Sequence, residues 1–285
     1  MNKIKLAAII VTYNPDIDIL IKNVTSISSQ VEATVIVDNG SDNYIDISHA
    51  IDKYNNVVAL RNSTNKGIAQ ALNYGMTYLH KSGYNWVLTL DQDSICEPNM
   101  ATQLSSHIDE NIGILCPSIN YLGWSGKSKK DRPIIEEIKA CMTSASLTNV
   151  KAWESCGKFN EGYFIDFVDN DFCERLRINK YKIIRINSCI LNHKLGEAFE
   201  KKIIGKFSIR YSIHNPIRYY YMTRNNIVFI RTYRERLNIL REYLKLLYII
   251  TIGLIFSTEK RETCKYVRLG ITHANKGIMG KLSNY

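Results

Sequence analysis

Two aspartates two residues apart, Asp91 and Asp93, follow an apolar run at residues 86–90 and enclose Gln92. Two carboxylates in one turn can share a hard divalent cation that keeps coordination positions for water and a substrate phosphate. Such a cation would neutralise the charge of a diphosphate leaving group. A solvated acidic turn has the same sequence, so the pair indicates a metal site only together with matching partners elsewhere in the chain.

Other polar residues at the ends of apolar runs could bind a nucleotide. Asp38 could accept a hydrogen bond from the imide N–H of uracil or thymine, or it could cap the backbone of its own turn. Asn65, Lys66 and Gly67 precede a helical pattern and could offer backbone N–H groups and a cation to phosphate. A simple helix start is the alternative for these three residues.

A third cluster of acids lies in residues 162–177, where an aromatic and apolar strand is expected to carry Asp166. Asp169 and Asp171 follow at the expected start of a helix. Burying several carboxylates is costly unless they bind a cation or take part in acid–base chemistry. Capping of the helix N-terminus is the alternative for Asp169 or Asp171.

Two further segments carry residues of interest. His193 could complete the coordination of a metal as a neutral imidazole, or it could be an ordinary surface histidine. Arg218, Tyr220 and Arg224 combine arginines that bind phosphate with a tyrosine that stacks on sugars or bases. A packed helix and an RNA-binding surface are the alternatives for this segment.

Alternating strands and helices must position these residues. The predicted strands lie at residues 6–12, 34–37, 57–61 and 86–90, and the predicted helices at residues 17–29 and 68–79. Strands separated by helices indicate βαβ crossovers and a parallel sheet. Ligands of such sheets bind at the carboxyl ends of the strands. The polar clusters after these strands are therefore expected to converge on one crevice.

The rest of the chain is less regular. We expect a short strand at residues 112–117, a polar loop at 121–132, an apolar stretch at 183–191 and helices from 203 to the end. No internal repeat or low-complexity tract interrupts this pattern.

The charge is unevenly distributed. The 285 residues carry a net charge of +10, but residues from 201 onward contain 17 Lys and Arg against 4 Asp and Glu, a net charge of +13. The first 200 residues therefore carry a net charge of −3. The C-terminal part is expected to meet an anionic partner: nucleic acid, a phospholipid surface or a phosphate-bearing substrate.

The cysteines and the N-terminus indicate a compartment. Seven cysteines are scattered without a Cys-x-x-Cys pair, which fits a reducing environment better than a disulfide framework or a zinc site. The apolar run after Lys5 is too short for the core of a signal peptide. The sequence thus predicts a cytoplasmic protein.

Taken in order, the motifs resemble those of family 2 glycosyltransferases with the GT-A fold, specifically the bacterial rhamnosyltransferase branch. The matching segments are 11–15 (VTYNP), 37–41 (VDNGS), 65–69 (NKGIA), 90–94 (LDQDS), 164–169 (FIDFVD), 193–197 (HKLGE) and 220–225 (YYMTRN), together with Arg175. The resemblance covers roughly residues 4–280. It implies a Rossmann-like, mostly parallel α/β sheet flanked by helices in residues 1–200, and a basic helical region in residues 201–285.

The resemblance also implies roles for the residues. The expected nucleotide-binding residues are Thr12, Tyr13, Asn14, Asp38, Asn65, Lys66, Gly67, Asp91 and Gln92. The expected ligands of Mg²⁺ or Mn²⁺ are Asp91, Asp93 and His193. Asp169 would be the general base and Asp166 would support it or the acceptor. Many members have Glu-Asp where this chain has Val168-Asp169, which leaves the role of Asp171 open. Arg218, Tyr220 and Arg224 would face the acceptor or a phosphate.

The implied reaction is an inverting transfer of a sugar, L-rhamnose from dTDP-L-rhamnose, to a lipid-linked saccharide in the synthesis of O antigen or another surface polysaccharide. A UDP-sugar donor is the alternative. A nucleic-acid-binding protein and a nucleotidyltransferase fit less well: the acidic crevice would repel a polyanion, and no Gly-rich basic loop follows the first strand. No nucleic-acid partner is therefore expected.

The apolar run at residues 244–256 is about 13 residues long, whereas a span of the bilayer core needs about 20. Basic residues flank it on both sides. This pattern predicts peripheral attachment to the cytoplasmic face of an anionic inner membrane. A buried helix in the interface of a homo-oligomer is the alternative.

Overall fold

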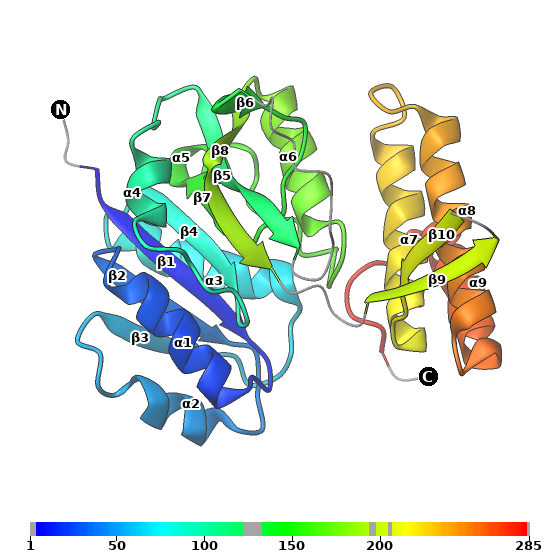
Figure 1. The fold of residues 1–285 in the computed structure, drawn as a ribbon, viewed down its shortest axis with the longest axis horizontal. Helices are drawn as coiled ribbons and strands as arrows, with labels where there is room; N and C mark the ends of the chain where they lie inside the picture. The colour runs from blue at the N-terminus through cyan, green and yellow to red at the C-terminus, as the bar shows by residue number, and fades with distance from the viewer. Residues whose placement is uncertain (1–3, 122–132, 194–197, 205–206, 284–285) are drawn as a thin grey trace. The chain divides into compact units, whose positions relative to one another are not determined.

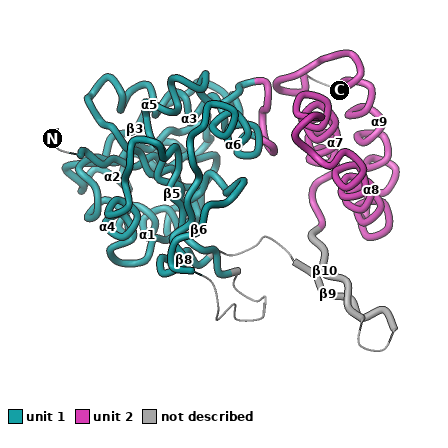
Figure 2. Tube along the Cα trace, turned by 90° about the horizontal axis from the view of Figure 1, so that it is seen from above, with its two compact units in different colours: residues 1–161, 168–194 teal, residues 162–167, 195–285 magenta. Residues whose placement is uncertain are grey.

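The computed structural model describes residues 4–121, 133–193, 198–204 and 207–283. The chain forms two compact units (Figure 2). The first contains residues 1–161 and 168–194, and the second contains residues 162–167 and 195–285. The chain therefore leaves the first unit at residue 162 and returns to it at residue 168. The functional division into residues 1–200 and 201–285 stays a prediction.

The first unit is built on one eight-stranded sheet with the order β3-β2-β1-β4-β7-β5-β8-β6. The strands are β1 (Leu6–Thr12), β2 (Ala33–Asp38), β3 (Val57–Arg61), β4 (Trp86–Asp91), β5 (Ile112–Tyr121), β6 (Ile135–Glu137), β7 (Ser146–Asn149) and β8 (Lys182–His193). β1 to β4 pair in parallel, as does β5 with β8. β7 and the edge strand β6 run antiparallel to their neighbours. The sheet is thus mostly parallel, as predicted.

Helices cover both faces of this sheet (Figure 1). They are α1 (Ile17–Ser28), α2 (Tyr44–Ile51), α3 (Ile68–Lys81), α4 (Met100–Ser105), α5 (Val150–Ser155) and α6 (Val168–Ile178). Ile10 and Leu20 share one core cluster, which joins β1 to α1. On the other face of β1, Ile9 lies against Gly75 of α3. Successive strand residues point to opposite faces, so an apolar run without alternation is what a strand covered on both faces requires.

The predicted strands β1 to β4 and helices α1 and α3 are confirmed to within two residues at their ends. β5 is longer than the predicted 112–117, because its pairing with β8 shifts register at Pro117 and Ser118 and then continues to Tyr121. Residues 122–132, most of the predicted polar loop, lie outside the described residues.

The register of the parallel strands decides where their polar ends lie. Thr12 is level with Asp38, and Asp38 is level with Arg61. On the other side of β1, Val11 is level with Asp91. The carboxyl ends of four strands therefore meet at one edge of the sheet, as the sequence predicted.

The described residues of the second unit form two antiparallel strands and three helices. The antiparallel strands β9 (Ala198–Ile204) and β10 (Phe207–Ser212) precede α7 (Pro216–Thr232), α8 (Ile239–Phe256) and α9 (Lys260–Lys276). The prediction of helix from residue 203 was wrong for residues 203–204 and 207–212, which belong to strands; the alternation of apolar and polar residues in FSIRYS (207–212) has the period of a strand. α7 begins where the Asn215 side chain caps Ile217 N–H at 3.2 Å and Pro216 fixes the first turn.

α7 packs between its neighbours through close contacts. A Cβ atom on Gly253 of α8 would lie 2.3 Å from the ring of Tyr219, so that ring occupies the space of the missing side chain. The carbonyl of Tyr220 likewise meets Gly270 of α9. α8 is therefore held by one face, with Leu246 and Ile252 buried beside Gly253.

The prediction of a strand that carries Asp166 was wrong. Residues 163–167 form no strand, and Asp166 and Phe167 have φ values of +61° and +69°. Two successive residues in the left-handed region bend the chain and prevent an extended segment. The amide of Asn225 on α7 donates to the carbonyl oxygens of Ile165 and Asp166 at 2.7 and 3.1 Å, in place of a neighbouring strand.

Candidate active site

Asp38 is buried at the end of β2, where several donors surround its carboxylate. It accepts hydrogen bonds from the Thr12 hydroxyl at 3.3 Å and from the backbone N–H groups of Gly40 and Ser41 at 3.3 and 3.1 Å. The Arg61 Nε atom lies 3.8 Å away. These bonds offset the cost of burying the charge. The Asp38 side chain is 0% exposed, and the alternative for Asp38, a residue that caps its own turn, is present in the structure. Its contact with a nucleotide stays a prediction.

Gly40 in the same turn has a φ of +84°, and a Cβ atom there would lie 2.7 Å from the backbone of Thr64. Only glycine fits this position without displacing the loop that follows β3. The turn after β2 and the loop after β3 are therefore in backbone contact.

Asn39 connects the same two segments through its side chain. Its amide nitrogen donates to Asn65 Oδ1 at 3.1 Å and to the carbonyl of Gly67 at 3.2 Å. Its amide oxygen accepts from Lys66 N–H and from the side chain of Asn62, both at 3.0 Å. The predicted phosphate-binding segment is thus fixed at its backbone, while the Lys66 side chain is exposed.

Three more hydrogen bonds extend this connection across β1 to β4. The N–H of Asn14 donates to Ser41 Oγ at 2.8 Å, and Asn14 Oδ1 accepts from Asp42 N–H at 2.8 Å. The N–H of Tyr13 donates to Gln92 Oε1 at 2.8 Å. Side-chain hydrogen bonds therefore join the segments after all four parallel strands. We call these segments, residues 12–15, 38–42, 62–67 and 91–94, the strand-end network.

Hydrogen bonds from neighbouring elements hold the backbone of the turn that carries Asp91 and Asp93. Asn23 of α1 donates to the carbonyl of Asp91 at 2.7 Å, and Asp91 N–H donates to Ser144 Oγ at 3.2 Å. Ser144 in turn lies 2.6 Å from Ser94 Oγ. Asp91 is half-buried and Asp93 is exposed. Two carboxylates on one turn with a fixed backbone are suitable ligands for a hard divalent cation.

Within the described part of the chain, no group of three or more His, Cys, Asp or Glu side chains is placed to hold a metal ion. His193, the third expected ligand, ends β8, and its side chain lies outside the described residues. Asp91, Asp93 and His193 therefore stay predicted ligands, and water and the diphosphate would fill the remaining coordination positions.

The two aspartates at the start of α6 have different surroundings. Asp169 is half-buried in the first turn, where its Oδ1 accepts the N–H of Asn170 at 2.8 Å. Asp171 is 2% exposed and lies against Arg175, whose Nε and Nη2 approach Asp171 Oδ2 at 2.9 and 2.7 Å. The structure thus gives Asp171 a structural partner and leaves Asp169 as the candidate base.

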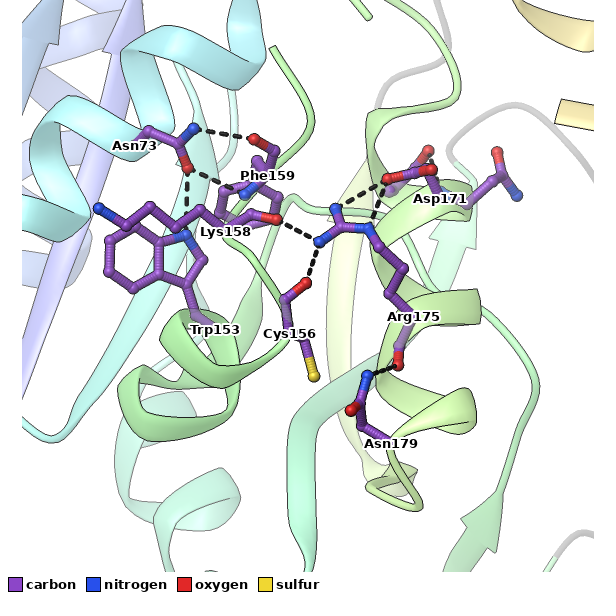
Figure 3. A network of polar contacts seen from close by, with 10 residues as sticks. Asn73, Trp153, Cys156, Lys158, Phe159, Asp171, Arg175 and Asn179 are labelled. Atoms are coloured by element: carbon purple, nitrogen blue, oxygen red, sulfur yellow. Dashed lines mark hydrogen bonds and ion pairs between the residues drawn. The ribbon is translucent and has the colours of Figure 1, made fainter. Parts of the chain in front are cut away.

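Arg175 also fixes the segment that leads to α6 (Figure 3). Its Nη1 donates to the carbonyl oxygens of Cys156 and Lys158. Asn73 of α3 holds the next residue, Phe159, by accepting from its N–H at 3.0 Å and donating to its carbonyl at 2.9 Å. Polar contacts of Arg175 and Asn73 therefore tie α6 and α3 to the segment that follows α5.

Asp166 and Arg218 form an ion pair within the second unit at 3.0 Å. Burial lowers the pKa of the neighbouring His214, and the charge of Arg218 lowers it further while Asp166 opposes the shift. Arg218 is the cation that pairs with Asp166, through its Nη2 and Nε atoms. Arg218 is 43% exposed and stays the predicted contact to acceptor or phosphate.

Tyr220 and Arg224 do not fit that prediction. Both are buried, and Arg224 is 0% exposed. Arg224 Nη1 donates to the Tyr220 hydroxyl at 3.0 Å and to the carbonyl of Gly280 at 2.7 Å. Gly280 N–H in turn donates to the carbonyl of Gly162. These residues hold the C-terminal tail and the 162–167 segment together, as in the packed-helix alternative.

Sequence reasoning missed Asn39 and Ser144. Asn39 lies in the turn at residues 38–41, which the sequence did single out. An amide side chain beside Asp38 in that turn was the signal that could have indicated its role. Ser144 reaches the turn after β4 only because β7 pairs antiparallel with β4, and no local pattern indicates that pairing.

Known proteins resemble this chain in sequence and structure. Residues 7–184 match the model of glycosyl transferase family 2. The chain belongs to glycosyl transferase family 2. It is 27% identical over 292 residues to the dTDP-rhamnosyl transferase RfbF of Shigella flexneri, with 96% of this chain and 95% of that protein covered.

Solved structures share the GT-A fold of this family member. S. aureus TarS residues 1–349 match with a TM-score of 0.58 and 15% identity, over 95% of this chain and 81% of that one. GalNAc-T7, crystallised with UDP, GalNAc and Mn²⁺, matches with a TM-score of 0.60 and 15% identity. That match covers 68% of this chain, which spans 44% of the length of GalNAc-T7.

The ion pair of Asp171 makes a testable prediction. Asp171→Asn removes the charge that faces Arg175 and is expected to lower the free energy of unfolding by about 2–3 kcal/mol, because a mostly buried guanidinium loses its partner. Glu262→Gln, which removes a carboxylate from an exposed pair with Lys265, should cost less than about 0.5 kcal/mol. Urea unfolding of both variants measures the difference, and equal stabilities would show that Asp171 has no structural role.

Proposed function

We propose that this family 2 glycosyltransferase transfers L-rhamnose from dTDP-L-rhamnose to a lipid-linked saccharide acceptor during synthesis of a surface polysaccharide such as O antigen. The observation that carries a nucleotide-sugar site is the strand-end network, which brings Asp38, Lys66 and Asp91 to one edge of the sheet. The name of the Shigella flexneri relative, which matches over almost the whole chain, supports the dTDP-rhamnose donor. A UDP-sugar donor is the second candidate.

Each part of the network would contact one part of the donor. Asp38 would accept the imide N–H of thymine, beside Thr12, Tyr13 and Asn14. The Lys66 side chain, at the start of α3, would bind phosphate, since the N-terminus of a helix favours anions. The N–H groups of Lys66 and Gly67 already donate to the side chains of Asn39 and Asn65, which holds this segment in place. The exposed Lys66 side chain and the fixed backbone around it support this assignment.

Asp91 and Asp93 would hold Mg²⁺ or Mn²⁺, and His193 would complete the ligand set. These oxygen ligands suit such a cation, because both carboxylates belong to one turn and Asn23 and Ser144 hold the backbone of that turn. The bound cation supplies positive charge to the diphosphate of the leaving group. Gln92 would keep this turn in register with the nucleotide-binding turn through its bond to Tyr13 N–H.

Asp169 would be the general base. It would take the proton of the acceptor hydroxyl while that oxygen forms a bond to the anomeric carbon of the donor. The bond from the same carbon to the diphosphate oxygen breaks, and dTDP leaves with the electron pair from the opposite face, which inverts the configuration. Asp171 is a poorer candidate because it is buried against Arg175. Asp166 and Arg218 would serve the acceptor.

The nucleotide preference can be tested by thermal shift. Purified protein with dTDP, UDP, GDP or CMP, with and without Mn²⁺, is compared with Asp93→Ala. A nucleotide at about 100 times its Kd stabilises the folded state by about 2.7 kcal/mol. We expect the largest metal-dependent shift with dTDP and its loss in Asp93→Ala. A larger shift with UDP would move the proposal to a UDP-sugar, and no shift with any nucleotide would contradict a nucleotide-sugar site.

The base can be tested separately. Asp169→Asn keeps the size of the side chain and removes its ability to accept a proton, so transfer from dTDP-L-rhamnose should fall roughly 10²- to 10⁴-fold. The dTDP-induced thermal shift should persist, because the nucleotide contacts lie on other residues. Product formation followed by mass spectrometry gives the rate. Wild-type activity in Asp169→Asn would exclude this residue as the base.

A further inference from the structure

Helix α8 carries an apolar face that is exposed to solvent. The side chains on this face and their exposed fractions are Leu240 (71%), Leu244 (55%), Leu247 (59%), Tyr248 (51%) and Ile255 (54%). Their spacing of three, four and seven residues places them on one side of a helix. Soluble proteins rarely leave a continuous apolar stripe of this kind uncovered unless it binds something.

The opposite face of α8 is already used. Leu246, Ile252 and Gly253 are buried, and the ring of Tyr219 from α7 lies directly over Gly253. α8 and α9 both pack against α7, as Figure 2 shows. The helix therefore cannot turn its leucines inward without losing these contacts. The exposed side chains therefore form an apolar surface along the helix.

Positive charge borders this surface. Arg241 and Lys245 line the same open groove as Leu240, Leu244 and Tyr248. Both are exposed, although Lys245 also pairs with Glu242 at 2.7 Å. The wider region from residue 201 carries a net charge of +13. An occupant that suits this face must be apolar in one layer and anionic in the next.

We propose that α8 docks on an anionic lipid bilayer. Its leucines would enter the boundary between headgroups and acyl chains, and Arg241 and Lys245 would contact lipid phosphates. A second copy of the chain is a poorer occupant, because it would bring two regions of net charge +13 together. Among the described residues, no helix is long and apolar enough to cross a membrane. This inference rests on α8 and does not depend on the sugar that is transferred.

Sedimentation with lipid vesicles tests the proposal on the full chain. Vesicles of phosphatidylcholine alone are compared with vesicles that also contain phosphatidylglycerol, at salt concentrations from about 0.1 to about 0.5 M. We expect at least roughly tenfold tighter binding to the anionic vesicles, weakening as salt rises. Failure of the wild-type protein to bind anionic vesicles would overturn the proposal and would leave the glycosyltransferase assays unaffected.

Variants separate the apolar and the electrostatic contributions. The triple variant L240Q/L244Q/L247Q should weaken vesicle binding by roughly tenfold or more, because it removes apolar area without changing the charge. Arg241→Gln with Lys245→Gln should reduce both the affinity for anionic vesicles and its salt dependence. Ile45→Gln, at a 69% exposed position on α2, is the matched control and should bind as wild type does. Circular dichroism checks that each variant is folded.

Two results would contradict the assignment of α8. One is a triple variant that binds vesicles as tightly as the wild-type protein does. The other is a wild-type dimer, detected by analytical ultracentrifugation, that the triple variant converts to a monomer while neither protein binds vesicles. In that case the apolar face would be a contact between copies of the chain.

Discussion

The parallel register of β1 with β2 and β4 is the constraint on which the candidate active site depends. Because Thr12 is level with Asp38 and Val11 is level with Asp91, the turn after β2 and the acidic turn after β4 lie at the same edge of the sheet. A shift of one residue in either pairing would send the strand's core side chains to the wrong face. The same apolar packing that fixes the register therefore also fixes the site.

The residues that hold the site are mostly neutral amides and hydroxyls, whereas the residues proposed to react are acids. Asn39, Gln92 and Ser144 accept backbone N–H groups of the strand-end segments, and Asp38 is the carboxylate that shares this task through the N–H groups of Gly40 and Ser41. The two aspartates at the start of α6 also have different tasks. Asp171 forms a structural ion pair with Arg175, whereas Asp169 is the proposed base. In the second unit, Arg224 and Asn225 order residues 162–167 in a comparable way.

Local patterns predicted the strands β1 to β4, their parallel sheet and the polar ends, because unbroken apolar runs and turn residues depend only on nearby sequence. They failed where distant partners decide the conformation. The bend at Asp166 follows from the amide of Asn225, about sixty residues away. Burial of Arg224 follows from helix packing that periodicity does not reveal. The strands at residues 198–204 and 207–212 were missed, although residues 207–212 alternate apolar and polar side chains.

The central claim is that the turn after β4 and the turns after β1 and β2 form one site for a metal and a nucleotide. Binding of Mn²⁺ measured by electron paramagnetic resonance, with and without dTDP, tests it most directly, because two ligands of one site must raise each other's affinity equally. We predict that dTDP raises the affinity for Mn²⁺ by at least about tenfold, within the usual range of such coupling, and that Asp93→Ala abolishes the effect. An affinity for Mn²⁺ that is the same with and without dTDP would contradict the account.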